Sequence, residues 1–597
     1  MISFVVTRRW QLSLLSLGML LTLAPDPLRR DAVVAAQYES LDPGLGDWIQ
    51  RFSADRKSIE FKHREPLSAV RREQLTQLYR VYLADLEKIN FPGLSLAGKI
   101  DYVLLRNELD YQLQLLRLEG ERDAAAMRWL PGIEIIVALL EEHERSHELP
   151  PRQTAEQLVA IRTRLSKEVA LWPAEPTAVE QTAGIRAVVA LKEVRKRLAD
   201  LHQFYLEYDP LYTWWCKNPY ELLSSELEKV EGELGKRCGN TEDPDKIIGQ
   251  PIGSEGMEIE LRHEMIPYSP AELIEIAERE FRWCDQQMLA AANAMGHGDD
   301  WRAAMETVKQ RHVDPGKQPA MIRNLAEESI RFLKDRDLLT IPTLCEQAWR
   351  MEMMSPERQR VNPFFLGGDT IIVSYPTEKM THAEKLMSMR GNNEHFARAT
   401  VQHELIPGHH LQWFMMDRYR PYRKAFETPF WIEGWALYWE MLLWDLDFPR
   451  SPEDRVGMLF WRKHRCARII FSLGYQLGRM TPEQCVDYLV ERVGHERLNA
   501  EAEVRRSVMG GYSPLYQAAY MLGGLQIRAL HKELVESGTI SNRDFHDAIL
   551  RQGPIPITLV RSALTGEPPL PTASPGWRFA EEVVLEGAEQ SLRAADK

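Results

Sequence analysis

Three of the 16 histidines lie within eight residues of one another, in a segment that also contains a glutamate, a proline and a glycine. The segment, residues 402–412, reads Q-H-E-L-I-P-G-H-H-L-Q. In zinc peptidases with the pattern H-E-x-x-H, two histidines one helical turn apart bind one metal ion, and the glutamate polarises the metal-bound water. His403 and Glu404 match the first two positions of that pattern. The segment therefore predicts metal-assisted hydrolysis.

The spacing of the histidines requires a break in the helix. Four residues after His403 stands Pro407, so the second metal ligand would be His409 or His410. On an unbroken helix His409 would be rotated by about 240° from His403, and His410 would lie about 10 Å further along the axis. Pro407 lacks a backbone N–H and Gly408 tolerates unusual dihedral angles, so a bulge here could return His409 to His403. The alternative is an ordinary helix that ends at Pro-Gly, with exposed or capping histidines.

A second segment offers a third metal ligand. Residues 431–440 read W-I-E-G-W-A-L-Y-W-E, begin shortly after Pro429 and predict a helix. A catalytic zinc with two histidines and a water needs one more protein ligand, and a glutamate on a following helix is a common solution. We assign Glu433 to that position, although an isolated glutamate is more often a surface charge. Glu440 lies two turns further on, and we expect it to be solvated rather than to support a ligand.

Together these segments resemble the bacterial domain-of-unknown-function 885 family, whose pattern is H-E-x-x-P-G-H with a later E-G-W-A. The resemblance includes residues 517–523 (Q-A-A-Y-M-L-G) and residues 553–556 (G-P-I-P), and it covers the chain from about 40 to 570. It implies a mostly helical fold that is placed with zinc peptidases of the gluzincin type. These peptidases hydrolyse peptide bonds with one zinc ion.

The resemblance also implies roles for individual residues. By likeness to gluzincin aminopeptidases, His403 and His409 would bind zinc, Glu433 would be the third ligand and Glu404 the catalytic base. Two extra residues separate the histidines here, which leaves the choice between His409 and His410 open, although the family pattern favours His409. The expected cofactor is therefore Zn²⁺.

The reaction also needs a donor for the oxyanion that develops in the transition state. Zinc would lower the pKa of its water toward ~7, and Glu404 would pass the water's proton to the leaving amine. Tyr520, within the family-like segment 517–523, is our first choice as the oxyanion donor. A structural or surface role is the alternative for Tyr520 and for each other candidate, namely Tyr512, Tyr516, Arg505 and His495.

The elements that must position these residues are mostly helices. Apolar residues recur at spacings of three and four, which predicts amphipathic helices within residues 66–120, 155–172, 186–206, 271–295 and 318–338. One β-branched run, Thr370–Tyr375, predicts a strand closed by Pro376. In gluzincins an edge strand at this place pairs with the substrate backbone, and a buried structural strand is the alternative. We expect a mainly α, large helical metallopeptidase-like fold with a small β element beside the zinc helix.

The predicted organisation has three parts: an export signal in residues 1–36, an N-terminal helical lobe in 37–340 and a zinc-site catalytic lobe in 341–597. The signal shows Arg8 and Arg9 before an apolar run and small residues before Gln37. The apolar run is shorter than the ~20 residues that span a bilayer. We therefore expect an exported, periplasmic or extracellular protein without stable membrane insertion after signal removal.

Composition narrows the class of protein. The 597 residues are 44% hydrophobic and 27% charged, which is typical of a globular protein. A formal charge of -13 and the absence of a basic cluster argue against a nucleic-acid partner. Six cysteines without C-x-x-C spacing argue against a cysteine zinc site, and they could be buried thiols or disulfides (Cys216 with Cys238, Cys466 with Cys485).

The predicted function is an exported zinc-dependent hydrolase that cleaves the amide bond of a peptide or of a small amide substrate. Two alternatives stay open, along with the oligomeric state. One is an amidase acting on non-peptide amides, which the same chemistry permits. The other is a helical binding protein that keeps the fold without turnover. Glu404 favours an enzyme, because a structural zinc site would fill all four positions with protein ligands and would not need that carboxylate.

Overall fold

The computed structural model describes residues 44–580, apart from 174–175, 240–242, 244, 360–361, 363 and 573–575. The predicted export signal lies outside the described residues. The protein is mainly α-helical with two short strands, which confirms the prediction of a mainly α fold with a small β element. Within the described residues, no helix combines the length and the apolar character needed to span a membrane.

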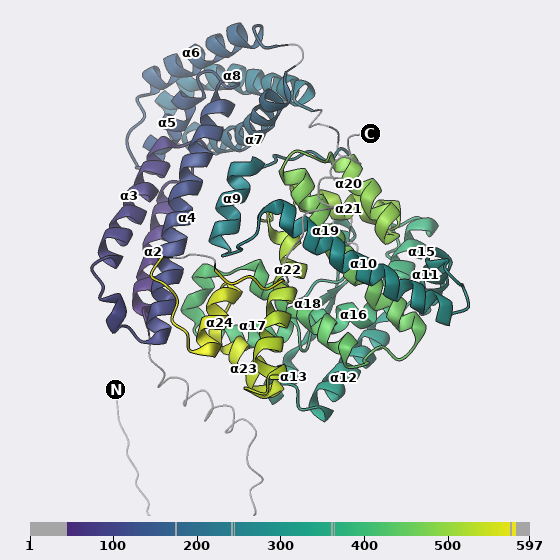
Figure 1. Cartoon of the computed structure of the whole chain (residues 1–597). Coiled ribbons are helices and arrows are strands. Elements are labelled where there is room, and N and C mark those ends of the chain that lie inside the picture. Colours follow the sequence, from purple (N-terminus) through teal and green to yellow (C-terminus); the bar gives the residue numbers. More distant parts are fainter. Residues whose placement is uncertain are drawn as a thin grey trace, which may run out of the picture.

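The first eight elements form a helical arm along the left side and the top of Figure 1. Helices α5 to α8 pack around their own core of leucine, isoleucine and valine side chains, which explains the three- and four-residue periodicity of this part of the chain. The elements of the arm are α2 (Gly46–Lys62), α3 (Ala69–Leu86), η1 (Phe91–Gly93), α4 (Leu96–Met127), α5 (Ile133–Glu144), α6 (Pro151–Val169), α7 (Ala178–Leu206) and α8 (Pro210–Arg237).

The rest of the described chain is a helical body, in teal, green and yellow in Figure 1. Its central helix, α19, is buried along nearly its whole length and packs against α10, α16 and α22. The body contains α9 (Gly253–His263), α10 (Pro270–Ala294), α11 (Trp301–Gln310), α12 (Gln318–Asp335), α13 (Thr343–Ala348), β1 (Arg350–Met353), α14 (Pro356–Gln359), β2 (Thr370–Val373), α15 (His382–Gly391), α16 (Glu394–Glu404), α17 (His409–Met416), η2 (Pro421–Phe426), α18 (Pro429–Asp445), α19 (Pro452–Gln476), α20 (Pro482–Tyr488), η3 (Leu489–Val493), α21 (Arg497–Met509), α22 (Tyr516–His531), η4 (Lys532–Glu536), α23 (Asn542–Gln552) and α24 (Ile557–Thr565).

The helices that the sequence predicts are present. The segments 66–120, 155–172, 186–206, 271–295 and 318–338 fall on α3 with α4, α6, α7, α10 and α12 respectively. All six cysteines are buried free thiols, so neither of the two possible disulfides forms.

The β element lies beside α16, as predicted. Strand β2 pairs in parallel with β1, and its buried Ile371 and Val373 share a core cluster with Val401 of α16. On its other edge Ile372 exchanges two backbone hydrogen bonds with Leu366, at 2.7 and 3.0 Å. Because Leu366 pairs with the middle of the edge that faces away from β1, the structure favours the alternative, a buried structural strand, over an edge that pairs with the substrate backbone.

The arm and the body share a core. One hydrophobic cluster joins α2, α3 and α4 to side chains between residues 406 and 560, and the ion pair of Asp101 with Arg423, at 2.8 Å, is fully buried between them. This cluster contains residues from before and after residue 340. The predicted boundary between two lobes at that residue stays a prediction.

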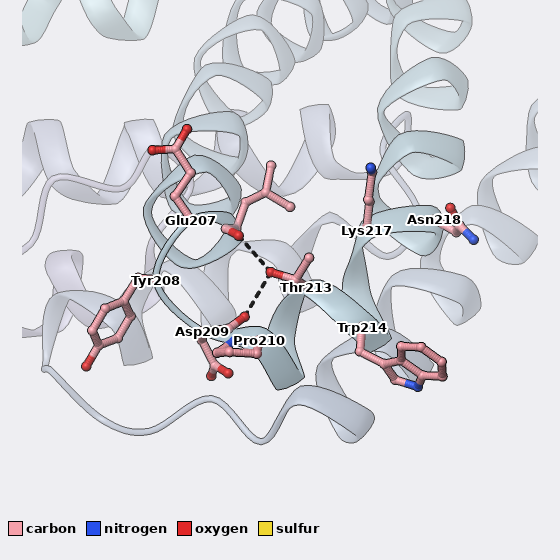
Figure 2. Close-up of a pocket in the computed structure, with 9 residues that line it drawn as sticks. Glu207, Tyr208, Asp209, Pro210, Thr213, Trp214, Lys217 and Asn218 are labelled. Carbon is pink, nitrogen blue, oxygen red and sulfur yellow. Dashed lines mark hydrogen bonds between the residues drawn. The ribbon is translucent and has the colours of Figure 1, made fainter.

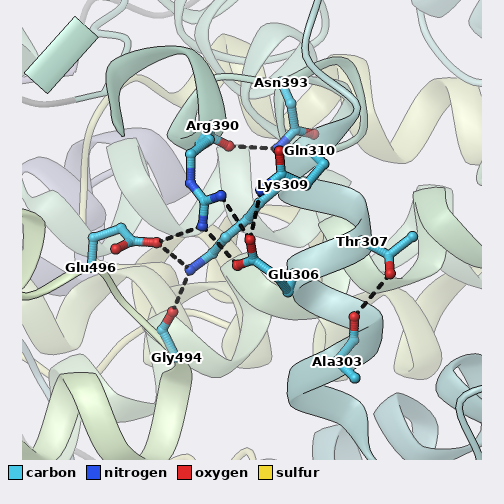
Figure 3. Close-up of polar contacts among 9 residues, drawn as sticks. All are labelled: Ala303, Glu306, Thr307, Lys309, Gln310, Arg390, Asn393, Gly494 and Glu496. Carbon is cyan, nitrogen blue, oxygen red and sulfur yellow. Dashed lines mark hydrogen bonds and ion pairs between the residues drawn. The ribbon is translucent and has the colours of Figure 1, made fainter. Parts of the chain in front are cut away.

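A polar cluster joins three helices of the body, α11, α15 and α21. Arg390 of α15 donates to both carboxylate oxygens of Glu306 on α11, each at 2.7 Å (Figure 3). Glu496, just before α21, accepts from Lys309 at 2.9 Å and from Arg390 at 3.2 Å. Helices α11, α15 and α21 are thereby tied together through one set of charges.

Candidate functional site

The helix that carries His403 breaks where the sequence predicts. Helix α16 ends at Glu404 and α17 begins at His409. At the turn between them, a methyl group on Gly408 would lie 1.7 Å from the carbonyl oxygen of His403, so only glycine fits. The break brings the two imidazole rings to a centroid distance of 4.9 Å. Both histidines are buried, so the alternative of exposed or capping histidines is wrong.

Side chains from two other helices hold the broken turn in place. Ser329 of α12 donates a hydrogen bond to the carbonyl oxygen of Ile406 at 3.0 Å. The indole N–H of Trp435 on α18 donates to the carbonyl oxygen of Pro407 at 2.7 Å. Buried carbonyl groups need such partners, and these two satisfy the ones that the broken helix leaves.

His409 and His410 point to different surroundings. The Nε2 atom of His410 lies 3.0 Å from the carbonyl oxygen of Cys345, to which it donates a hydrogen bond. His410 does not line the cavity that contains His403 and His409. The geometry therefore favours His409 as the partner of His403.

Two imidazole nitrogens converge on one carboxylate oxygen. The Oε2 atom of Glu433 lies 3.4 Å from Nε2 of His403 and 3.2 Å from Nε2 of His409. Ligand atoms at 2.0–2.1 Å from a tetrahedral zinc are about 3.3 Å apart, so this spacing fits zinc. The buried Oε2 atom accepts no well-formed hydrogen bond, which leaves its lone pairs available for a metal. Two imidazoles and a carboxylate form a donor set that suits zinc.

Glu404 belongs to the same cluster. The ligand atoms of His403, Glu404 and His409 all lie within 4.8 Å of one another, the only such group found in the described part of the chain. Of the two glutamates, Glu433 is the better placed to bind a metal, because its oxygen lies at ligand-to-ligand distance from both imidazoles. Glu404 is then the neighbouring carboxylate that can exchange a proton.

In both histidines the second ring nitrogen, Nδ1, also has a hydrogen-bond partner. Nδ1 of His403 lies 2.7 Å from Oε1 of Glu440, and Nδ1 of His409 lies 3.0 Å from the side-chain oxygen of Gln412. Metal-binding histidines usually donate their second N–H in this way, which fixes the ring and directs Nε2 to the ion. Glu440 is buried, so the expectation that it is solvated is wrong. The packing of α18 against α16 places it beside His403.

The two carboxylates at the centre have opposite pKa shifts. Burial alone would raise the pKa of Glu433, but the nearby His409 and His403 outweigh it and hold that pKa well below its usual range. Burial raises the pKa of Glu404, and the same histidines offset only part of the effect. Burial opposes the charged form of His403, yet the neighbouring carboxylates of Glu433 and Glu440 raise its pKa to about 9. Carboxylates with pKa values driven apart suit separate roles, one as a ligand and one as a proton carrier.

Close packing of α18 and α22 brings two tyrosines to the site. A methyl group on Gly434 would lie 2.6 Å from the backbone of Gly523, so the two helices touch through glycines. This approach places Tyr516 where its hydroxyl donates to Oε1 of Glu433. Tyr520 lies one turn further along, with its ring 6.1 Å from that of His403 and nearly parallel to it.

Three of the five candidate oxyanion donors line the cavity. Burial and the charge of Glu433 raise the pKa of Tyr520 to about 12, so its phenol keeps its proton at neutral pH and can donate a hydrogen bond. Tyr512 and Tyr516 also line the cavity. Arg505 instead donates to the backbone oxygens of residues 245 and 246, and His495 is hydrogen-bonded to a neighbouring buried histidine at 2.9 Å.

Sequence reasoning missed two parts of the cavity wall. The cavity has a volume of about 240 Å³, and Arg465, Arg468 and Arg506 line it. A usable signal existed, because arginines recur at every third position, 462, 465 and 468, in the middle of the buried helix α19. The second missed part is the segment 364–367, which runs before β2 and directly against Glu404. A methyl group on its last residue, Gly367, would lie 2.2 Å from Oε2 of that glutamate.

Comparison with known proteins identifies the family. The family model described as "Bacterial protein of unknown function (DUF885)" matches residues 62–564, and the chain belongs to this family. No curated protein matches the sequence.

Two solved structures have a similar fold. One is a candidate lipoprotein of unknown function from Shewanella oneidensis, with a TM-score of 0.64, 16% identity and coverage of 87% of this chain and 98% of that one. The other is a candidate lipoprotein from Colwellia psychrerythraea, with a TM-score of 0.52, 16% identity and coverage of 91% and 99%. At this identity the likeness concerns the fold alone.

Proposed function

We propose that the chain is an exported zinc-dependent hydrolase that cleaves peptide amide bonds. His403, His409 and Glu433 would hold the metal. The observation that carries the proposal is the convergence of the two imidazole Nε2 atoms on one oxygen of Glu433, at 3.4 and 3.2 Å, in a buried cavity. Two features support it: the held Nδ1 atoms of both rings, and the buried Glu404 beside them.

The chemistry that zinc supplies when bound is a lower pKa for water and a polarised scissile carbonyl. The carboxylate of Glu404 takes a proton from the attacking water and gives it to the nitrogen of the leaving amine. The remaining hydroxyl adds to the carbonyl carbon, and the C–N bond then breaks as the nitrogen takes the proton from Glu404, so one water is consumed for each bond. Tyr520 donates a hydrogen bond to the developing oxyanion. Tyr516 holds Oε1 of Glu433 and leaves Oε2 for the metal.

Export rests on separate support. The basic and apolar pattern of residues 1–36 predicts a signal. Two proteins of the same fold are described as candidate lipoproteins, a class of exported protein. Both observations support export, and we propose that the activity lies in the periplasm or outside the cell.

Metal analysis of the purified protein, followed by a screen of short peptides and acyl-amino acids, tests the proposal. We expect about one zinc per chain, lost on chelation together with hydrolysis. His403→Ala combined with Glu433→Ala should abolish metal binding. His410→Ala is the matched control, because this neighbour of His409 is bonded to Cys345 and lies outside the cavity, and it should keep the metal. Full zinc occupancy in the double variant would refute the ligand set.

A further inference from the structure

Three arginines from two helices reach the cavity that contains His403 and Glu433. Arg465 and Arg468 lie one turn apart on α19, and Arg506 comes from α21. We call these three residues the arginine cluster. With Arg358 at the rim, four guanidinium groups line the cavity against two carboxylates, those of Glu404 and Glu433.

The charges of the arginine cluster are only partly met by the protein. Arg468 donates from Nε to Glu503 at 2.7 Å, and its buried Nη1 has no hydrogen-bond partner. Arg465 lies 3.6 Å from Glu440, and its buried Nε has no partner.

Arg506 has the weakest partner of the three. Its Nε donates to the hydroxyl of Tyr512 at 3.2 Å, and it forms no ion pair with any carboxylate in the described residues. The side chains of Arg465 and Arg468 are more than nine-tenths buried, and leaving buried polar atoms unpaired is costly. A ligand with an anionic group would supply the missing acceptors.

The position of the cluster limits what that anion can be. Tyr520 contacts both sides: its ring centroid is 6.1 Å from that of His403, and 4.6 and 4.3 Å from the guanidinium carbons of Arg465 and Arg468. The ring of Tyr520 thus separates the arginine cluster from His403. An extended peptide advances about 3.5 Å per residue, so an anion held there would lie about one to three residues from the scissile bond.

We propose that the arginine cluster binds the free C-terminal carboxylate of the substrate. The proposal rests on the proposed hydrolase function and specifies its substrate class: short peptides cleaved about one to three residues before their C-terminus. Guanidinium groups match carboxylates in shape and can donate two parallel hydrogen bonds. The cavity of about 240 Å³ is below the ~300 Å³ at which pockets for drug-sized ligands begin, which fits a short C-terminal group.

The first test measures binding without turnover. Metal-free protein and the zinc-loaded Glu404→Gln variant are titrated by calorimetry with N-acetylated di- and tripeptides that end in either a carboxylate or a carboxamide. We expect the carboxylate to bind at least about tenfold more tightly in both proteins. Equal binding of the two forms, or binding of neither, would overturn the proposal whether or not the chain is a hydrolase.

The second test uses variants of α21. Arg506→Gln should weaken binding of the carboxylate peptides by about ten- to one-hundredfold and leave the carboxamides unchanged. Arg506→Lys keeps the charge but not the planar fork, so it should lose less. Arg505→Gln is the matched control, since its guanidinium donates to backbone oxygens away from the cavity. An equal loss in the Arg505 and Arg506 variants would assign the effect to the helix and overturn the proposal.

The third test separates this proposal from the function on which it rests. Active protein is offered the same acid and amide pairs, together with an amide peptide that carries a glutamate side chain. Preference for the free acid supports the C-terminal assignment. Equal cleavage of acid and amide, or preference for the glutamate amide, contradicts it while leaving the hydrolase intact. If no peptide is cleaved although peptides with a free C-terminal carboxylate bind more tightly, the hydrolase proposal is wrong. The assignment of the arginine cluster as a carboxylate site is then still supported.

Discussion

Two cavities of this protein differ in size and in chemistry, and the smaller one contains the reactive groups. The larger, about 550 Å³, lies where α7 meets α8 and is lined by Tyr208, Trp214, Lys217 and their neighbours (Figure 2). Its labelled side chains spread in different directions, and Trp214 is 82% exposed. The hydrogen bonds drawn there join Thr213 to backbone oxygens at 2.7 and 2.9 Å, a local contact between the two helices.

The cavity at His403 has about 240 Å³, yet both of its histidines, both of its glutamates and two of its arginines, Arg465 and Arg468, are buried. No histidine lines the cavity at α7 and α8, and its polar side chains can meet water. Ionisable groups that are buried together have perturbed pKa values, which is what acid–base and metal chemistry requires. Volume alone is therefore a poor guide to function here, and the burial of paired charges is a better one.

The largest effect that tests the contrast between the two cavities is expected from replacing Glu404, the proposed base. Glu404→Gln preserves the shape of the side chain but cannot accept a proton, so we expect kcat for any substrate to fall by about 10³-fold. Zinc content and the thermal unfolding midpoint should change little. Steady-state kinetics and metal analysis on the same preparation check both statements. Turnover at the parent rate would show that Glu404 is not the base.

Removing one hydroxyl tests the assignment of the oxyanion donor. Tyr520→Phe keeps the ring beside His403 and should lower kcat by about 10²-fold, the usual effect of losing one such donor. Tyr512→Phe is the matched control on the same wall, and we expect a smaller loss because Tyr512 is 36% exposed, and a hydrogen bond that competes with water stabilises an oxyanion less. Comparison of kcat for the two variants decides the assignment. A larger loss in Tyr512→Phe would transfer the role to that residue.

A smaller effect, on zinc affinity, is expected from replacing Glu440, which contacts the proposed ligand His403 and not the metal itself. Glu440→Gln weakens the hydrogen bond that holds Nδ1 of His403, and losing such a partner typically costs about 10- to 100-fold in metal affinity. Competition with a chelator of known affinity measures it. Zinc affinity equal to that of the parent would show that the imidazole needs no carboxylate partner.

The parts of the site that could be predicted from sequence are those fixed by local geometry. The break between His403 and His409 follows from a proline and a glycine within six residues, and the structure has it. The burial of Glu440 could not be predicted, because α16 and Arg465 of α19 reach it from other parts of the chain and no local pattern encodes these contacts. The arginine cluster needs α19 and α21 to meet at one wall, so spacing along α19 could suggest at most two of its members.

The same limit applies to the fold. Helices with apolar residues at spacings of three and four were predictable because each buries one face. The strand at 370–373 was also predictable, since β-branched residues favour extended backbone. Its neighbours were not, because β1 and Leu366 reach it from other parts of the chain. Tertiary contacts decide which edge of a strand stays free, so the sequence could not choose between a substrate-binding edge and a structural strand.

The smallest expected effect belongs to the cavity at α7 and α8. Trp214→Ser removes a large but exposed side chain, so we expect the free energy of unfolding to change by no more than about 0.5 kcal/mol, and catalysis and zinc affinity not to change.

Trp435→Ser is the matched variant beside the cavity at His403. That indole is fully buried and donates to the carbonyl oxygen of Pro407, so its loss should cost about 3–5 kcal/mol and disturb the turn between the histidines. Chemical denaturation of both variants measures the difference. Loss of activity in Trp214→Ser with the fold intact would show that the larger cavity takes part in function, and the contrast between the two regions would then be wrong.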